Sequence, residues 1–258
     1  MHHPDLLPHT KKDQFRQFRR YRSWFHIPHP STDARKEIAD WIGTEKQRLN
    51  EKMAKECDTI VAGLYEYLAI YEPLFPKKTE FIPFPIVCDD DTPTIEFHKD
   101  GEPIKIFIGI NKSRSAYKGT DIMLKAAKEV KSKYPDKLKL TVVESVPFDE
   151  YRKLMMSCDA IVDQLYSYTP SMNPLEAMSH GLICIGGGEP ENYVVLNETE
   201  LRPIVNVEPT FKSVYSQIEN MVLHPENIST MQHQSIEYIR KHHDYIKVAK
   251  QYEKLYMK

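Results

Sequence analysis

The stretch at residues 168–180 brings carboxylate, hydroxyl and amide side chains to the point where a strand-like run leads into a helix. Ser171 and Asn173 stand just before the helix expected at residues 174–180, and Glu176 falls in its first turn. The unpaired N–H groups at such a helix start bind anions, and Ser or Asn there can cap the helix or contact a phosphate. Glu176 can accept hydrogen bonds from two vicinal hydroxyls, as a ribose presents them. The alternative interpretation is that Glu176 only complements the helix dipole, and spacing does not decide between the two.

A second candidate site is the loop at residues 109–119, GINKSRSAYKG, which follows a strand-like run. Arg114 and Lys118 in this loop can neutralise a diphosphate, Arg by paired hydrogen bonds and Lys as a point charge. The alternative is a solvated basic loop, which is the commoner role of such a pair. Neither the P-loop spacing nor G-x-G-x-x-G after a strand is present.

A third candidate is the turn within residues 144–151, ESVPFDEY, also at the end of a strand-like run. Its backbone at Ser145–Pro147 can meet a flat base, although an ordinary turn into a helix has the same sequence character. In an open parallel sheet, ligands bind outside the carboxyl ends of the strands, where all three candidate loops would meet.

Residues 15–25, FRQFRRYRSWF, alternate aromatic and arginine side chains at helical spacing. A core-packed amphipathic helix is the favoured interpretation. The alternatives are a segment that touches anionic lipid and, less favoured because the net charge is −2, a nucleic-acid contact. No nucleic-acid partner is therefore expected.

No metal site is expected from the sequence. His2, His3 and His9 lack a spacing that would hold a metal, and the four cysteines lie far apart. The chain has 258 residues, 41% hydrophobic and 28% charged, and no apolar run approaches the roughly 20 residues that span a bilayer. A cytoplasmic protein is expected, at most peripherally attached to the inner face of a membrane.

The elements that must position these loops alternate between short apolar runs and amphipathic stretches. Strands are expected at 104–110, 137–144, 159–165, 182–187 and 201–207, the last as an edge strand, and helices at 118–134, 147–158 and 174–180. This alternation predicts an α/β fold, a Rossmann-like doubly wound parallel sheet covered by helices on both faces.

The flanking regions are less regular. Helices are expected at 31–56 and 64–75, a strand at 57–63, a strand broken by prolines at 79–87, and only helices from 208 onward. The polar, turn-rich residues 88–103 are expected to form a linker. The predicted organisation is a partial N-terminal α/β domain (1–87), the linker, a second α/β domain (104–240) and a C-terminal helix (241–258).

The motifs in combination resemble a known family. The segment 159–191, DAIVDQLYSYTPSMNPLEAMSHGLICIGGGEPE, is similar to the donor-binding segment of retaining GT-B glycosyltransferases, with P-x-E-A-M, a glycine and G-G-x-P-E in order. R-x-x-x-K-G-T-D at 114–121 matches the arginine and lysine that precede the first helix of that domain. The resemblance covers roughly residues 57–258. It implies that residues 1–87 belong to the acceptor-side domain, that residues 104–240 bind the nucleotide sugar, and that the C-terminal helix at 241–258 packs back on the N-terminal part.

The resemblance implies roles for individual residues. Arg114 and Lys118 would hold the diphosphate, Glu176 would grip the ribose, and the base would lie near Ser145–Pro147. It implies catalysis by Arg114, Lys118 and Glu176, and nucleotide-sugar binding by Gly109, Ser145, Val146, Pro147, Tyr168, Thr169, Pro170, Ser171, Met172, Asn173 and Glu191.

Two departures from the family pattern stand out. Tyr168 occupies the position, eight residues before Glu176, where the family has a second glutamate, and Thr169 follows where a glycine is usual. Recognition of the donor sugar is therefore expected to differ. The first half of the family's N-terminal domain also has no counterpart here, which suggests a truncated chain or one that relies on a partner.

The expected function is transfer of a sugar from a UDP-, GDP- or ADP-linked donor to a glycan or lipid-linked acceptor, as in polysaccharide biosynthesis, with retention. No metal and no other cofactor is expected. The alternatives are a non-catalytic or truncated nucleotide-sugar-binding protein and a nucleotide-sugar 2-epimerase of the same fold.

Overall fold

A computed structural model describes residues 43–89 and 91–257. The chain divides between Ile82 and Pro83 into two compact units. The segment 15–25 lies outside the described residues, so its proposed contact with lipid stays a prediction. In the described part of the chain, no helix combines the length and the apolar character needed to cross a bilayer.

The described part of the first unit is a small βαβ arrangement. Its elements are α3 (Glu45–Glu56), β1 (Ile60–Ala62), α4 (Tyr65–Tyr71) and β2 (Thr79–Phe81). The two strands pair in parallel. β2 ends before Pro83 and Pro85, which have no N–H to donate to a neighbouring strand.

The second unit is built on a parallel sheet with the strand order β4-β3-β5-β6-β7. Its strands are β3 (Ile104–Ile110), β4 (Leu138–Glu144), β5 (Ala160–Val162), β6 (Ile183–Gly186) and β7 (Val205–Asn206). The predicted doubly wound sheet is confirmed, with β7 at one edge. Because the chain passes from β3 to β4 on one side and returns to β5 on the other, the strand order reverses between β3 and β5. The carboxyl ends of these two strands mark the switch point, where ligands bind in such sheets.

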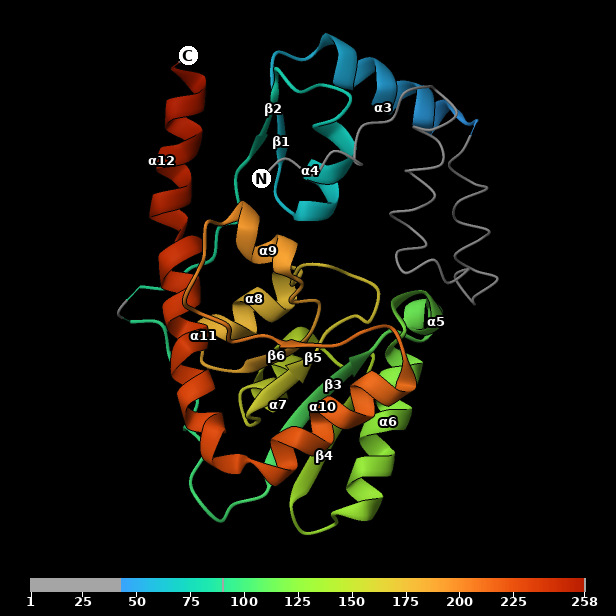
Figure 1. Ribbon diagram of the computed structural model, residues 1–258, viewed down its shortest axis with the longest axis vertical. Helices are drawn as coiled ribbons and strands as arrows, with labels where there is room; N and C mark the ends of the chain where they lie inside the picture. Colours follow the sequence, from blue (N-terminus) through green and yellow to red (C-terminus); the bar gives the residue numbers. More distant parts are fainter. Residues whose placement is uncertain (1–42, 90, 258) are drawn as a thin grey trace. The chain divides into compact units, whose positions relative to one another are not determined.

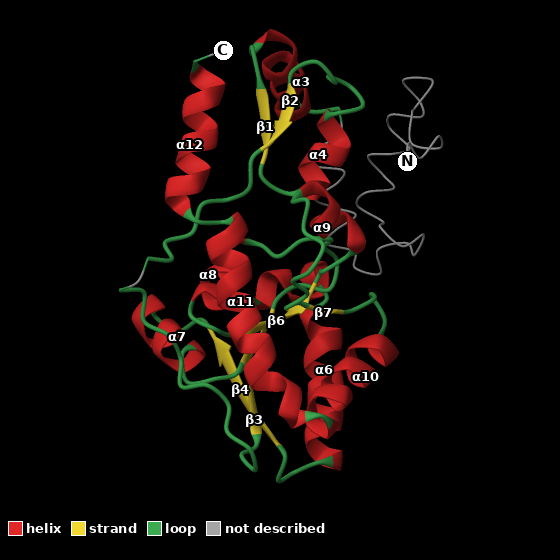
Figure 2. Ribbon diagram, turned by 60° about the vertical axis from the view of Figure 1, so that its left-hand side comes forward, coloured by secondary structure: helices red, strands yellow, loops and turns green. Residues whose placement is uncertain are grey.

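Helices cover both faces of this sheet (Figures 1 and 2). The helices of the second unit, in chain order, are η1 (Lys112–Arg114), α5 (Ser115–Lys118), α6 (Thr120–Lys133), α7 (Phe148–Met155), α8 (Met172–Ser179), α9 (Pro190–Val195), α10 (Phe211–Leu223), η2 (Pro225–Asn227), α11 (Ile228–His242) and α12 (Tyr245–Tyr256). α6 and α10 lie side by side on one face, and Figure 2 shows α7 on the opposite side.

Alternation of side chains along β3 fixes these two layers. Ile106 and Ile108 are buried in a cluster with residues of α6 and α10. Phe107, between them, is buried on the other face in a cluster with Met155 of α7 and Ala177 of α8. A strand buried on both faces reads as a continuous apolar run, and this explains the sequence at 104–110.

Residues 83–103 form an extended strap along the second unit. Among its described residues, the predicted linker 88–103 contains no helix or strand. The N–H of Ile95 donates to the His180 carbonyl at 2.9 Å, and that of His98 to Gln232 Oε1 at 2.9 Å. Ile86 forms a parallel bridge with Asp244. The predicted domain limits and the packing of residues 241–258 on the N-terminal part stay predictions.

Candidate functional site

Gly109 and Lys118 lie at the carboxyl end of β3, where the strand points toward α5 (Figure 1). A Cβ on Gly109 would lie 2.8 Å from the Tyr151 ring, so the glycine admits this ring of α7 against the strand. The backbone carbonyl of Lys118 accepts a hydrogen bond from the Leu165 N–H at 2.8 Å. This bond fixes the start of the loop after β5 against the end of α5.

Lys118 lines a hollow at the end of β3, described below, and Arg114 is not among the residues that line it. Arg114 is exposed, and its guanidinium lies over the Tyr117 ring, 5.4 Å from the ring centroid. The spacing predicted one site for both cations. Arg114 ends η1 and Lys118 ends α5 one helical turn later, and of the two only Lys118 lines the hollow.

Ser145–Pro147 form the turn between β4 and α7. Ser145 has a φ of +52°, a left-handed conformation that serine rarely adopts outside tight turns. Pro147 is the N-cap of α7. Ser145 and Val146 line the same hollow as Lys118, whereas Phe148, the first residue of α7, lines a different one.

Helix α8 begins at Met172 rather than at the expected residue 174. Pro174 is tolerated because the first turn of a helix needs no intrahelical N–H donors. Glu176 therefore lies in the second turn, not the first. The helix dipole acts mainly within the first turn, so the interpretation of Glu176 as a dipole partner loses its basis.

Ser171 and Asn173 hold partners other than the helix itself. Ser171 is the N-cap of α8, but its side chain makes no capping hydrogen bond. Its hydroxyl donates instead to Asp163 Oδ1 at 3.1 Å. Asn173 Nδ2 donates to the Tyr151 hydroxyl at 3.0 Å, which ties α8 to α7.

Asp163, directly after β5, is a site residue that the sequence did not single out. It is only 7% exposed, and burial raises the pKa of its carboxyl, while Lys118 and Ser171 act in the opposite direction. It was missed because DAIVDQL reads as one strand, in which Asp163 has no distinguishing spacing. Its position at the carboxyl end of a central strand was the only available signal.

These residues surround a hollow of about 260 Å³ at the switch point, here named the Lys118 hollow. It is lined by Gly109, Ile110, Asn111, Lys118, Thr120, Val143, Ser145, Val146, Tyr151, Val162, Asp163, Ser171 and Asn173. A lysine, hydroxyl groups and the start of α8 face it. That chemistry suits an anionic group of phosphate type.

A second hollow of about 620 Å³, the Glu176 hollow, adjoins the first at Asn173, which lines both. Three exposed apolar side chains gather on it: Val87 is 60% exposed, Phe148 67% and Met172 46%. Exposed apolar side chains that gather on one concave surface indicate a binding site for an apolar part of a ligand. Glu176 supplies a carboxylate to this hollow, and Arg152 supplies a guanidinium.

A short hydrogen-bond chain holds Arg152 beside Glu176. His180 Nδ1 lies 2.5 Å from the carbonyl oxygen of Pro93, which places the ring proton on Nδ1. Nε2 can then accept from Arg152 Nη2 at 3.4 Å. Arg152 Nε lies 3.9 Å from Glu176 Oε1. The strap thus contributes to the orientation of the carboxylate.

The loop between β5 and α8 is packed against the glycine turn after β6. A Cβ on Gly187 would lie 2.1 Å from the carbonyl oxygen of Ser167, so only glycine permits this approach. The Tyr168 carbonyl accepts from the Glu189 N–H at 3.2 Å. Thr169 is buried in the same loop, with 3% of its surface exposed.

The remaining predicted residues have different surroundings. Pro170 is buried just before α8. Glu191 lies in the first turn of α9 and lines neither the Lys118 hollow nor the Glu176 hollow. Met172 and Asn173, in contrast, line the Glu176 hollow.

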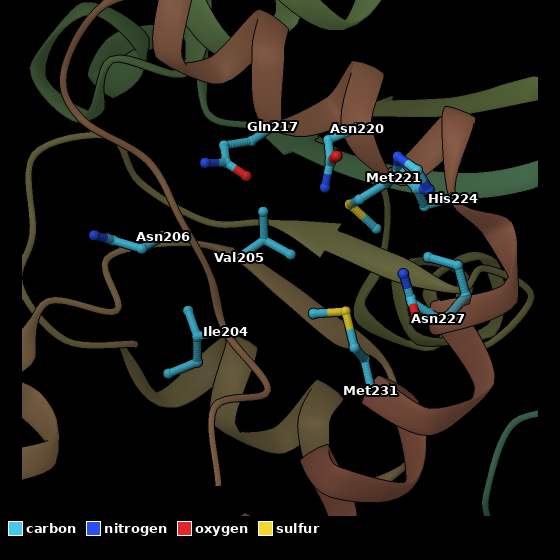
Figure 3. Close-up of a pocket in the computed structure, with 10 residues that line it drawn as sticks. Ile204, Val205, Asn206, Gln217, Asn220, Met221, His224, Asn227 and Met231 are labelled. Atoms are coloured by element: carbon cyan, nitrogen blue, oxygen red, sulfur yellow. The ribbon is translucent and has the colours of Figure 1, made fainter.

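A further hollow, of about 260 Å³, lies beside the edge strand β7, between α10 and the start of α11 (Figure 3). Its polar lining consists of the ring of His224 and the amide side chains of Asn206, Gln217, Asn220 and Asn227. None of the predicted site residues lines it. It is therefore separate from the chemistry at the switch point.

Solved structures share this architecture. Sucrose-phosphate synthase from Thermosynechococcus elongatus matches with a TM-score of 0.60 and 13% identity, over 84% of this chain and 63% of that one. A point mutant of S. aureus TarM, in complex with fondaparinux, alpha-GlcNAc-glycerol and UDP, matches with a TM-score of 0.61 and 11% identity, over 82% and 46%. The fold is that of GT-B glycosyltransferases.

A third match is Anabaena HepE in complex with UDP-glucose. Its TM-score is 0.60 and its identity 12%, over 83% of this chain and 68% of that one. The chain spans less than two thirds of the first two structures. No protein-family model matches the sequence, and no curated protein sequence matches it.

Proposed function

We propose that this chain transfers a sugar from a nucleotide diphosphate sugar to a glycan or lipid-linked acceptor, with retention and without a metal. One observation carries the proposal: two hollows adjoin at the switch point. The first contains the cation Lys118 beside the start of α8, and the second contains the carboxylate of Glu176 among exposed apolar side chains. A nucleoside diphosphate has the matching sequence of charged, hydroxylated and flat apolar groups. The UDP bound to TarM and the UDP-glucose bound to HepE support this assignment.

In this proposal the Lys118 hollow receives the diphosphate. Lys118 and the free N–H groups at the start of α8 stabilise the charge that develops on the leaving nucleotide. Arg114 approaches the same anion from the exposed turn before α5. Because these groups supply positive charge without a metal, we expect EDTA to leave the transfer rate unchanged.

The Glu176 hollow receives the nucleoside. Glu176 accepts hydrogen bonds from the two ribose hydroxyls, and the base lies against Phe148 and Met172. Tyr168, in the place of the family's glutamate, offers a hydroxyl to the donor sugar. The acceptor is a glycan or a lipid-linked molecule, and we propose that the reaction belongs to polysaccharide biosynthesis in the cytoplasm.

The first experiment measures UDP, GDP and ADP binding by thermal shift and calorimetry. Glu176→Gln keeps the shape of the side chain but removes its charge, and we expect it to weaken UDP binding by about 10- to 100-fold, as expected for loss of charged hydrogen bonds. Its melting temperature should change little, because the side chain is 41% exposed. Glu129→Gln, on the exposed face of α6, is the matched control.

The absence of binding by all three nucleotides would refute the donor site. Binding with sugar transfer to a glycan supports the enzyme, and the anomeric configuration of the product tests retention. Binding without transfer or donor hydrolysis would favour a nucleotide-sugar-binding protein instead. Reversible isomerisation of the donor without an acceptor would identify a 2-epimerase.

A further inference from the structure

Asp163 places a carboxylate inside the hollow that the proposed function assigns to a diphosphate. The residue follows β5 directly and lines the Lys118 hollow together with Lys118 and Ser171. The residue is 7% exposed, so its carboxylate has little contact with bulk water. The carboxylate of Asp163 therefore lies in the same hollow that an incoming phosphate group would occupy.

The contacts of Asp163 are those that a bound phosphate would make. Its Oδ1 accepts from the Ser171 hydroxyl at 3.1 Å, and its Oδ2 is 3.4 Å from the Ser171 backbone nitrogen. Ser171 is the residue from which α8 starts. A Cβ on Gly186 of β6 would lie 3.3 Å from the Asp163 Cβ, so the side chain is also packed from the neighbouring strand.

The groups that face Asp163 limit where a proton can go. Lys118 of α5 attracts its charge, and Tyr151 of α7 and Cys184 of β6 are the other titratable groups on which its charge acts. Burial raises the pKa of the Tyr151 hydroxyl and of the Cys184 thiol, so both stay neutral near pH 7. Among the described residues around this hollow, Asp163 is thus the group placed to take up a proton.

We propose that Asp163 takes up one proton from solution when the donor diphosphate binds, so that donor binding is coupled to proton uptake. The proposal rests on the proposed function. Two anions within one hollow of about 260 Å³ repel each other, and protonation of one removes the repulsion. The neutral carboxyl keeps an oxygen that accepts from Ser171, and its new O–H donates to a phosphate oxygen.

Burial supports this step from the protein side. It raises the pKa of the Asp163 carboxyl in the free protein, against the influence of Lys118 and the hydrogen bonds from Ser171. A diphosphate beside the carboxyl raises that pKa further and also competes for Lys118. Each negative charge of the bound ligand therefore favours the protonated form of Asp163.

The test is calorimetric titration of the full chain with UDP at pH 8, in buffers of different ionisation enthalpy. The second pKa of a phosphate is about 6, so UDP itself binds no proton at pH 8. We expect uptake of up to about one proton per UDP bound, and an affinity that falls by at most about tenfold per pH unit as the pH rises. Asp163→Asn should abolish the uptake and flatten this dependence.

Asp136→Asn is the charge-matched control, because Asp136 is exposed in the turn before β4, at the opposite end of that strand from the site. It should keep the proton uptake. The same uptake in Asp163→Asn as in the wild type would overturn the proposal, as would UDP binding by the wild type without uptake at any pH. The second result stands even if Asp163→Asn does not fold. Failure of the wild type to bind UDP overturns the proposed function itself.

Discussion

The side chain of Lys118 is the cation that the Lys118 hollow offers to a ligand. It faces the buried carboxylate of Asp163, and the carbonyl of the same residue anchors the loop after β5. A side-chain substitution leaves that backbone hydrogen bond in place. The charge and the scaffold can therefore be separated by experiment.

Lys118→Ala should weaken binding of UDP by about 10- to 100-fold and leave binding of uridine within about twofold. The difference arises because the cation interacts with phosphate and not with the nucleoside. Calorimetric titration with both ligands measures it. Lys153→Ala, an exposed lysine of α7, serves as control, and equal losses for UDP and uridine would contradict the assignment of Lys118 to the phosphates.

The sequence predicted some of these residues and missed others for identifiable reasons. Glu176 and Lys118 were found because their loops follow strand-like runs. Asp163 was not, since a carboxylate that ends a buried run looks like a strand residue. Arg152 was missed as well, because a helical arginine becomes informative only when it lies 3.9 Å from Glu176.

At the scale of elements, α7 and α8 form one part of the wall of the Glu176 hollow, and the strap forms the other. Phe148 and Arg152 are four residues apart on α7, which places them on one helical face. Met172 and Glu176 of α8, also four residues apart, line the same hollow. Each of the two helices thus presents one apolar and one charged group to the hollow.

Phe148→Ser should lower UDP affinity by about fivefold or more, because stacking of a base on an aromatic side chain contributes about 1–3 kcal/mol. Binding of pyrophosphate, which has no base, should not change. The free energy of unfolding should also stay similar, since Phe148 is 67% exposed. Val194→Ser, an equally exposed residue of α9, is the control; an unchanged UDP affinity in Phe148→Ser would place the base elsewhere.

The element order was predictable because periodicity changes clearly between strand and helix along residues 104–207. The ends of elements were less so. Helix α8 starts two residues earlier than expected, as a proline in the first turn costs no hydrogen bond. The expected edge strand at 201–207 is reduced to Val205–Asn206, because in the described sheet its only partner strand is β6.

At the scale of the second unit, His243 connects the strap to the end of α11. Its Nδ1 lies 3.0 Å from the Phe84 carbonyl oxygen, and it is 5% exposed. Burial lowers the pKa of His243 to about 4, although the hydrogen bond with Phe84 acts in the opposite direction. The folded protein therefore holds this ring in its neutral form at pH values where the unfolded chain binds a proton.

The free energy of unfolding should fall as the pH falls from about 6.5 to about 4, by at most about 1.4 kcal/mol per pH unit from this residue. Above pH 6.5 both states hold the neutral ring, and the dependence disappears. Urea unfolding at pH 7, 6 and 5 measures the slope. His243→Gln should reduce it and the exposed His224→Gln should not; equal slopes in all three proteins would show that another group governs this range.

The strap has a consequence for the order in which the chain becomes structured during its synthesis. Ile95 pairs with His180, His98 with Gln232, and Ile86 with His243 and Tyr245. All these partners leave the ribosome long after residues 83–103 have emerged. The strap therefore cannot complete these contacts until residues 232–245 have been synthesised, and the nascent chain carries its apolar side chains, such as Ile86 and Ile95, incompletely covered until then. A chaperone that binds extended apolar segments would meet its substrate there.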